Sequence, residues 1–265
     1  MLILPTPVPA GNSFVRIPRS KAATMRLLLE TVQRGSRYWT GGVIPTDKAI
    51  RLAEKFADRY AIDSSASTRS RHKAQGISNA SLICYPENEN TFTPLRWWLL
   101  VTPGTGRVWE EETLLDTGNR RQQLTWGDHY VLVHLQRESK HGGGRHWTWF
   151  IRDALYADLE TSMRRYASAH GQRNGKERTD DLERLVATIR RMPGFHGIRT
   201  QQWALLTLGE HWWDQTHKAP WEGWSRKIPY VDKRQPVYHR PEPLRLDVLV
   251  QIQARRSGVL VRTLA

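Results

Sequence analysis

Hydrophobic positions near the N-terminus repeat with the spacing of a helix, and this pattern predicts a first long helix from Arg19 to Trp39. Pro18 precedes it and Ser20 can cap its first turn, which is how many helices begin. The apolar stripe of this helix consists of Met25, Leu28, Leu29, Val32 and Trp39. A stripe of this width requires burial, so we expect the helix to pack on a core.

The other side of the predicted helix carries arginines. Arg19, Arg26 and Arg37 are seven and eleven residues apart, which aligns them to within roughly 20° on a helix. Arg34 lies about a sixth of a turn to the side, and Glu30 is the one acid among them. Because arginine binds phosphate oxygens through paired N–H groups, the row indicates a phosphate-binding face; a solvated face is the alternative.

A second helix and a polar segment follow. Thr46 can cap a helix whose apolar face runs from Ile50 to Tyr60, so the N-terminal part predicts a helical hairpin. Residues 64–75, SSASTRSRHKAQ, have too little apolar content for a core and predict a surface loop. This loop holds the densest positive charge in the chain, namely Arg69, Arg71, His72 and Lys73. Phosphate binding and simple solubility are equally good interpretations of that charge.

After the loop, hydrophobic and polar residues begin to alternate, which predicts an antiparallel meander of about four to six strands. The expected strands are ASLICY, LRWWLLVT, RVWEE, QQLTW, HYVLVHLQ and HWTWFIR. In HYVLVHLQ we expect the aliphatic face of Val131, Val133 and Leu135 to be buried. The connection KHGGGRH places Lys140 and Arg145 around three glycines, and it could bind an anion or serve only as a flexible link.

Three more helices are predicted between residues 153 and 213, starting near Asp153, Asp180 and Gly197. The first two are joined by the basic segment GQRNGKER. Its cations are Arg173, Lys176 and Arg178. Two helices with a basic tip would form a projecting finger for nucleic acid, and a helical layer over one face of the sheet is the alternative.

From Asp214 the chain is rich in proline and lacks periodicity, whereas LRLDVLVQIQ and SGVLVRTLA predict two C-terminal strands. Together the patterns predict an α+β fold with an antiparallel sheet of ferredoxin-like or meander type, an N-terminal helical hairpin and an inserted helical finger. The expected divisions are an α+β domain over residues 1–152, the finger over 153–213, and a segment over 214–265 whose strands return to the sheet.

The amino-acid composition indicates that the protein has a polyanionic partner. The 265 residues contain 40 Lys and Arg against 26 Asp and Glu, a formal net charge of +14. No apolar run approaches the roughly 20 residues that span a bilayer, so we expect no membrane partner. The opening MLILPTPVPAG lacks the features of a signal peptide, and we therefore expect a cytoplasmic protein.

Motifs for metal or cofactor chemistry are absent from the sequence. The chain has no HExxH, Cys pair, DxDxDG, GxGxxG or GxxxxGK[ST] pattern, so we expect neither a metal nor a cofactor. Cys84 is the single cysteine and excludes a disulfide framework. RNA can instead be cut by its own 2′-OH when fixed cations hold the developing charge. His239, flanked by Tyr238 and Arg240, is a candidate acid or base for such a step.

The basic residues and helices described above also form a recognisable layout. It consists of Arg26 and Arg37 on the first helix, Arg240 and Arg245 beside the C-terminal strand, and the helical pair around GQRNGKER. Over most of the chain this layout resembles the CRISPR RNA-processing endonucleases of plasmid-borne type IV systems. The resemblance implies a metal-independent endoribonuclease that cuts repeat stem-loop RNA with arginines and keeps its product in a ribonucleoprotein complex. The alternative is a noncatalytic DNA- or single-strand-binding protein of a plasmid or other mobile element.

Overall fold

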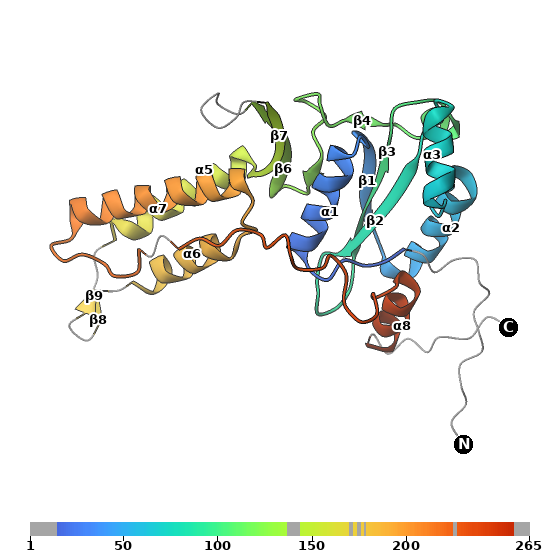
Figure 1. The fold of residues 1–265 in the computed structure, drawn as a ribbon. Coiled ribbons are helices and arrows are strands. Elements are labelled where there is room, and N and C mark those ends of the chain that lie inside the picture. The colour runs from blue at the N-terminus through green and yellow to red at the C-terminus, as the bar shows by residue number, and fades with distance from the viewer. Residues whose placement is uncertain are drawn as a thin grey trace, which may run out of the picture. The chain divides into compact units, whose positions relative to one another are not determined.

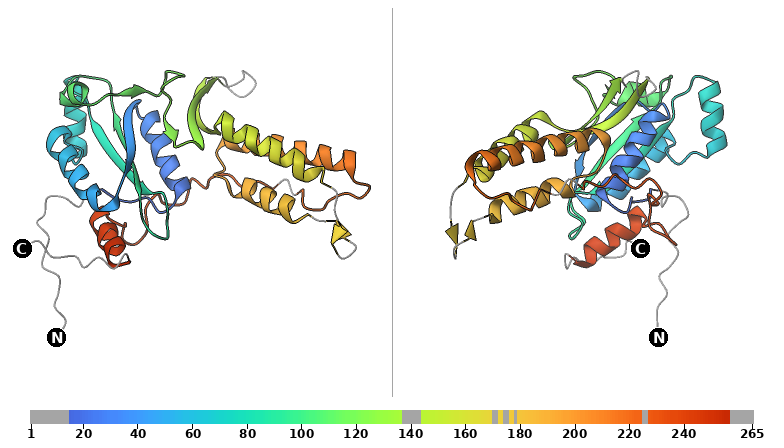
Figure 2. Two further views of the ribbon diagram at one scale, coloured as in Figure 1. Left: turned by 180° about the vertical axis from the view of Figure 1, so that it is seen from behind. Right: turned by 60° about the vertical axis from the view of Figure 1, so that its left-hand side comes forward.

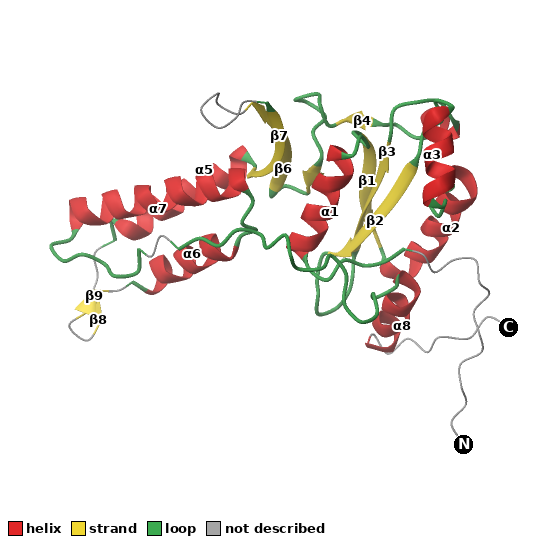
Figure 3. Cartoon of the chain, in the orientation of Figure 1, coloured by secondary structure: helices red, strands yellow, loops and turns green. Residues whose placement is uncertain are grey.

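The computed structural model describes residues 15–136, 144–169, 172–173, 176–177, 179–224 and 227–256 (Figure 1). Helices and antiparallel sheets occur together in these residues, which confirms the predicted α+β class (Figure 3). Within the same residues, no helix is both long enough and apolar enough to cross a membrane.

The chain divides into two compact units. Unit 1 contains residues 1–122 and 234–265, and unit 2 contains residues 123–233. The later strands group with the helices that follow them rather than with the earlier strands. The boundaries therefore fall at residues 122 and 233, not at the expected 152 and 213.

Unit 1 is built on a four-stranded antiparallel sheet with the strand order β2-β3-β1-β4. The strands are β1 (Tyr38–Ile44), β2 (Ala80–Pro86), β3 (Leu95–Val101) and β4 (Leu115–Asp116). Helices α1 (Lys21–Gln33) and α2 (Ala49–Tyr60) lie on opposite faces of the sheet (Figure 1). Because both faces are covered, β2 and β3 are apolar almost throughout instead of alternating.

Helix α1 begins where the sequence predicts. The Ser20 side chain accepts a hydrogen bond from the Ala23 N–H (3.2 Å) and caps the first turn. Met25, Leu28 and Val32 are buried, as the apolar stripe requires. The predicted core face of this helix is therefore confirmed over residues 21–33.

The same helix ends earlier than predicted because of Gly35. Gly35 adopts φ 110°, a conformation that side-chain-bearing residues rarely take, and the chain then enters β1. Trp39 is a buried strand residue, not the last member of the helical stripe. Arg19 and Arg37 also lie outside the helix, so the predicted row of three aligned arginines does not exist.

Strand β1 contains Gly41 and Gly42, which are unusual residues inside a strand. A Cβ on Gly41 would lie 2.7 Å from the carbonyl oxygen of Trp97 in β3. A Cβ on Gly42 would lie 3.3 Å from the indole nitrogen of the same Trp97. The two glycines thus let β1 pass close to a tryptophan of its neighbour strand.

Two short helices of unit 1 replace elements that the sequence predicts differently. Helix α3 (Ala66–Ala74) occupies the predicted surface loop, and helix α4 (Arg107–Glu111) occupies the predicted strand RVWEE. A 3-10 helix, η1 (Thr46–Lys48), leads into α2. No residue of α3 is buried, so a hydrophobic pattern could not reveal this helix.

Unit 2 combines a three-stranded sheet with three helices. The sheet has the order β5-β6-β7, so the predicted single meander is in fact two separate sheets. Its strands are β5 (Thr125–Trp126), β6 (Tyr130–Gln136) and β7 (Arg145–Ile151). Helices α5 (Asp153–Ala167), α6 (Asp180–Arg191) and α7 (His196–Thr216) follow near the predicted positions. The short antiparallel strands β8 (Gln172–Arg173) and β9 (Lys176–Glu177) lie between α5 and α6 in the chain.

The buried face of β6 is the opposite of the predicted one. Val131, Val133 and Leu135 are only half-buried, whereas Leu132 on the other face is fully buried. Leu132 pairs in register with Trp149 of β7, which is also fully buried. Packing of this cross-strand pair outweighs the larger number of aliphatic residues on the other face.

The chain returns to unit 1 through an irregular segment and ends its described part in helix α8 (Leu246–Arg256). The sequence predicts a strand there, because apolar residues stand at every second position from 244 to 252. The buried residues Leu246 and Leu249 are instead three apart, which is a helical spacing. The second predicted strand, SGVLVRTLA, lies outside the described residues.

Backbone hydrogen bonds attach the returning segment to the start of unit 1. The Ile17 N–H donates to the Leu244 carbonyl oxygen (2.8 Å), and the Leu246 N–H donates to the Val15 carbonyl oxygen (2.9 Å). Farther along, the Arg19 N–H donates to the carbonyl oxygen of residue 237 (2.9 Å). Residues far apart in the sequence therefore complete one unit together.

Candidate nucleic-acid interface

Helix α3 carries a basic surface that stands away from the sheet of unit 1 (Figure 2, turquoise). Its nine residues, ASTRSRHKA, include no buried side chain and no acid. Ser65 starts the helix by accepting a hydrogen bond from the Thr68 N–H (3.2 Å). A helix this short is marginal in water by itself, so it needs an anchor to the rest of the unit.

Arg69 supplies that anchor. Its guanidinium donates to the carbonyl oxygens of Ile62 (2.7 Å) and Ser64 (3.1 Å) and to the hydroxyl of Ser81 on β2 (2.8 Å). Burial lowers the pKa of Arg69, and the nearby Asp63 carboxylate opposes that effect. The donors of Arg69 are thus engaged within the protein, which corrects the expectation that this residue contacts phosphate.

The other cations of α3 occupy its last turn and are accessible. Arg71 and Lys73 are exposed and His72 is half-buried. Among the residues that the structure describes, no acid forms an ion pair with any of the three. The C-terminal end of a helix carries partial negative charge, which favours cations at these positions. Consecutive residues point about 100° apart around a helix, so this turn presents positive charge in several directions.

Arg26, which the sequence places on the phosphate-binding face, lies inside unit 1. Its side chain is 9% exposed, and its Nε lies 3.6 Å from the Glu30 carboxylate. Its Nη2 donates to the Gln235 carbonyl oxygen (2.7 Å). The C-terminal segment therefore reaches the first helix, where a backbone carbonyl meets Arg26.

Arg37 and Arg245 are each bound to a carboxylate nearby. Two nitrogens of Arg37 donate to Asp116 (3.1 and 2.5 Å), and two of Arg245 donate to Asp247 (3.0 and 2.5 Å). The hydrogen bond from Arg37 holds the pKa of Asp116 below its ordinary value, although burial opposes this. Such two-pronged pairs fix the arginine geometry. Arg26, Arg37 and Arg245, which the resemblance places at a cleavage site, thus have separate partners and do not converge on a position for one phosphate.

Four other predicted site residues of unit 1 lie at the ends of α1 or in the returning segment. Arg19 precedes α1, and Arg34 follows it and pairs with Glu30 (3.4 Å). His239 and Arg240 are exposed in the returning segment. The structure brings neither of these last two into hydrogen-bonding contact with Arg26, which binds Gln235 instead.

Three of the predicted nucleic-acid-binding residues of unit 2 lie in the described residues. Arg145 is exposed at the start of β7, where its Nε donates to a glutamine side chain of β6 (3.4 Å). Arg173 and Lys176 are directly paired positions of β8 and β9. Lys140 and Arg178 lie outside the described residues. The basic tip between α5 and α6 is thus a small hairpin over its described part.

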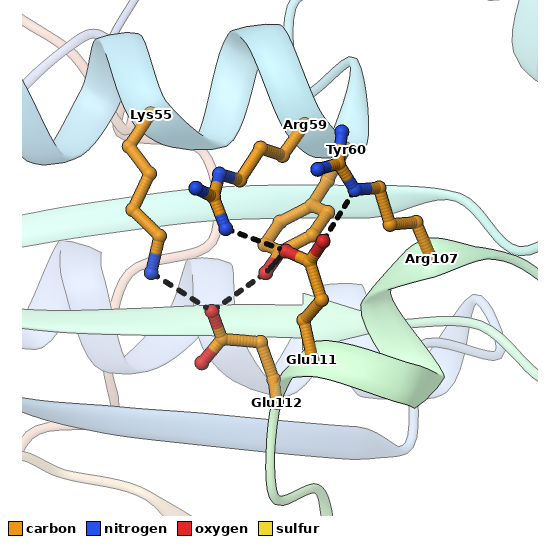
Figure 4. Close-up of polar contacts among 6 residues, drawn as sticks. All are labelled: Lys55, Arg59, Tyr60, Arg107, Glu111 and Glu112. Atoms are coloured by element: carbon orange, nitrogen blue, oxygen red, sulfur yellow. Dashed lines mark hydrogen bonds and ion pairs between the residues drawn. The ribbon is translucent and has the colours of Figure 1, made fainter.

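A second group of cations in unit 1 is neutralised within the protein (Figure 4). Arg59 of α2 and Arg107 of α4 both bind the Glu111 carboxylate, and Lys55 pairs with Glu112 (3.2 Å). We call this group the α2–α4 polar cluster. Its members are Lys55, Arg59, Tyr60, Arg107, Glu111 and Glu112. These cations need no external anion, in contrast to those of α3.

The Tyr60 hydroxyl joins the two acids of this cluster. Its oxygen lies 2.7 Å from Glu112 and 3.1 Å from Glu111. Burial, together with hydrogen bonds to Glu112 and Glu111, raises the pKa of Tyr60 above its ordinary value. Burial alone would raise the pKa of Glu111, but hydrogen bonds from Arg107, Arg59 and Tyr60 lower it. At neutral pH these shifts favour a neutral Tyr60 phenol beside a charged Glu111 carboxylate.

In the part of the chain that the structure describes, there is no metal-binding group of side chains and no reactive thiol. No group of three or more His, Cys, Asp or Glu side chains is placed there to hold a metal ion. Burial raises the pKa of the Cys84 thiol to about 12. A thiol protonated at neutral pH is a poor nucleophile, so Cys84 is a packing residue of β2.

Unit 2 presents arginines stacked on aromatic rings, which the sequence patterns did not reveal. The guanidinium of Arg199 lies 3.4 Å from the ring centroid of Tyr230, which is 66% exposed. The guanidinium of Arg164 lies 5.1 Å from the Trp212 ring. Each pair joins residues from different segments, so no local spacing marks it. The abundance of aromatic residues in a basic chain was the available signal.

No protein-family model matches the chain, and comparisons with curated proteins and with solved structures found no match either. The resemblance of the sequence layout to CRISPR RNA-processing endonucleases therefore stays a prediction. The side chains of the protein itself therefore indicate what it binds. Helix α3 is the strongest candidate for a nucleic-acid interface.

Proposed function

We propose that this protein binds RNA through phosphate contacts centred on the last turn of α3. One observation carries the proposal: Arg71, His72 and Lys73 are accessible on a helix that contains no acid. Elsewhere in unit 1, cations such as Arg59 are neutralised by carboxylates. The net charge of +14 supports the same conclusion, because it attracts a polyanion over long range.

RNA is proposed over duplex DNA for two reasons. The layout resemblance points to stem-loop RNA, and the unstacked bases of RNA loops bind to exposed aromatic rings. Tyr230, with Arg199 on one side of its ring, is suited to such stacking. Cytoplasmic location and membership of a ribonucleoprotein complex belong to the same proposal.

Cleavage of the bound RNA has less support than binding. Fixed guanidiniums stabilise a phosphorane-like transition state when they reach the phosphate that reacts. Arg26, Arg37 and Arg245 instead bind separate partners within unit 1. A metal-independent endoribonuclease therefore stays a prediction, tested by incubating labelled stem-loop RNA with the protein in EDTA. A product that disappears when the nucleotide 5′ of the cut is 2′-deoxy would establish it.

The binding proposal is tested by charge reversal on α3. Arg71→Glu combined with Lys73→Glu should weaken stem-loop RNA binding by about tenfold or more. It should also lower the slope of log affinity against log salt by about two units, because about two phosphate contacts are lost. Fluorescence anisotropy at several salt concentrations measures both quantities.

A matched control removes the same charge elsewhere in unit 1. Arg120 and Arg121 are exposed in the loop after β4, and their double substitution by Glu should change RNA affinity by less than about threefold. Equal losses in the two double variants would mean that only net charge matters. That result would overturn the assignment of the interface to α3.

A further inference from the structure

A cavity of about 310 Å³ opens in unit 1 beside strand β2, and we call it the edge pocket. The apolar part of its lining comes from Leu27 of α1, Ala53 and Ala57 of α2, and Leu82 and Ile83 of β2. Strand β2 is the end strand of its sheet, and in the described residues it pairs with β3 alone. The edge pocket therefore lies where the two helical layers meet at an open side of the sheet.

Three polar residues from separate parts of the chain complete the lining of this pocket: Arg16, Asp63 and Tyr238. The Arg16 guanidinium lies 5.9 Å from the ring centroid of Tyr238. Arg16 and Asp63 are both exposed. Within the described residues, neither of them forms an ion pair. Small-ligand sites combine apolar walls with a few polar groups that orient the ligand.

Each of these polar residues is held in place by its neighbours in the chain. Arg16 forms an antiparallel bridge with Arg245. Tyr238 follows residue 237, whose carbonyl oxygen accepts from the Arg19 N–H. Asp63 lies between Ile62 and Ser64, whose carbonyl oxygens both accept from Arg69. The backbone that carries each of these three residues is therefore fixed before a ligand arrives, which lowers part of the entropic cost of binding.

We propose that the edge pocket binds one unpaired guanine nucleotide of the RNA that α3 contacts. The base lies between the apolar walls, the Asp63 carboxylate accepts hydrogen bonds from its N1–H and N2–H groups, and Arg16 binds an adjacent phosphate. This inference rests on the proposed function, since it names a base within the same ligand.

Guanine fits the charges of the pocket better than the other bases do. Its Watson–Crick edge places two N–H donors side by side, which matches the two oxygens of a carboxylate. Adenine, cytosine and uracil each place an acceptor directly beside the donor on that edge, so none of them offers two adjacent donors to a carboxylate such as Asp63. The flat faces of a base suit walls of alanine, leucine and isoleucine, and extruded bases commonly enter such pockets.

The position of Asp63 connects the pocket to the basic helix. Asp63 precedes the Ser65 cap of α3 by two residues, and Arg69 of α3 holds the turn that carries it. Arg71 and Lys73 lie at the other end of this nine-residue helix, so an RNA strand that contacts them reaches Asp63 by running along the helix over roughly 10–13 Å. Charge complementarity is divided between the two features, because α3 attracts phosphates while the carboxylate selects a base.

The test uses the full-length protein and RNA hairpins whose four-nucleotide loops contain guanine, inosine or adenine. Inosine lacks the N2 amino group, so wild-type protein should bind the guanine loop about tenfold or more tightly than the inosine loop. Asp63→Ala should abolish this preference. Asp58→Ala, which removes one exposed acid from α2, is the matched control and should retain it. Melting temperatures check that all variants are folded.

A second measurement separates failure of the pocket from failure of the RNA proposal. Guanosine monophosphate should bind wild-type protein and the Arg71→Glu, Lys73→Glu variant equally, and Arg16→Ala should weaken its binding. No guanine preference in a protein whose RNA binding depends on α3 would overturn the edge pocket alone. Guanosine monophosphate binding without α3-dependent RNA binding would overturn the proposed function alone. If a free amino acid binds to the edge pocket and guanosine monophosphate does not, the pocket is a zwitterion site and the guanine assignment is overturned.

Discussion

Helix α3 and the α2–α4 polar cluster are two basic regions of the same unit. They differ in whether their cations pair with acids of the protein. In the cluster, Lys55, Arg59 and Arg107 meet two glutamates and a tyrosine. In α3, the exposed Arg71 and Lys73 form no ion pair with an acid among the described residues. The number of cations is similar in both regions, so the comparison shows that available partners decide whether a basic segment stabilises the fold or attracts a ligand.

The two regions also differ in how they are attached to the sheet. Helix α2 is held by apolar packing, since Phe56 and Tyr60 join Leu99 and Val101 in one buried cluster. Helix α3 is held by the hydrogen bonds of Arg69. Apolar packing couples a helix to the global stability of a unit, whereas a polar anchor permits local opening.

The largest effect is expected from Phe56→Ala. Phe56 is 1% exposed in the core under α2, and its truncation should lower the free energy of unfolding by about 3–5 kcal/mol. Arg71→Ala on α3 is the contrasting variant and should change it by less than about 0.5 kcal/mol. Urea unfolding followed by tryptophan fluorescence measures both, and similar losses would show that α3 is packed as firmly as α2.

A smaller and more local effect is expected from Arg69→Ala. Loss of the hydrogen bonds to Ile62, Ser64 and Ser81 should cost about 2 kcal/mol, most of it as opening of α3 rather than of the sheet. Hydrogen exchange should therefore increase in residues 62–75 and stay unchanged in β3. RNA affinity should also fall, because Arg71 and Lys73 lose their fixed positions. Faster exchange throughout unit 1 would instead place α3 in the global folding unit.

The smallest effect is expected in the dependence of the melting temperature on acidic pH. The pKa of Glu111 is lower in the folded protein than its ordinary value of 4.5. Its ionised form therefore stabilises the fold above about pH 4.5, and this stabilisation is lost as the pH falls through the lower folded-state pKa. Glu111→Gln should flatten the decline of melting temperature between about pH 5 and pH 3, whereas Arg71→Ala should leave the decline unchanged. Parallel curves for all three proteins would show that the cluster contributes nothing to acid stability.

Sequence patterns located the elements whose partners are local. The cap at Ser20 and the burial of Met25 and Leu28 follow from residues within one or two turns of each other. The early end of α1 depends on one backbone conformation at Gly35, and a single glycine after an arginine is a weak signal. The helix at residues 66–74 has no buried face, so the principal signal for a helix was missing.

The candidate site shows a different limit of prediction from sequence patterns. Arg26 lies away from the apolar stripe of α1, and a local view therefore places it in solvent. The structure buries it because Gln235, 209 residues later, covers that side of the helix. Arg16, Asp63 and Tyr238 form the edge pocket for the same reason: distant segments meet, and no spacing in the sequence records the meeting. By contrast, the accessibility of Arg71 and Lys73 follows from the polar composition around them.

The division of unit 1 between the two ends of the chain has a consequence for the order in which the protein forms. Residues 123–233 are synthesised before residues 234–246, which provide the partners of Arg26 and Ile17. At typical elongation rates the ribosome needs roughly 5–20 s to make this insert. During that time α1 lacks its cover, whereas the helices of unit 2 can already pack on their own sheet. We therefore expect the insert to mature first and the sheet of unit 1 to close around its returning segment last, as a slow step set by loop closure over long sequence separation.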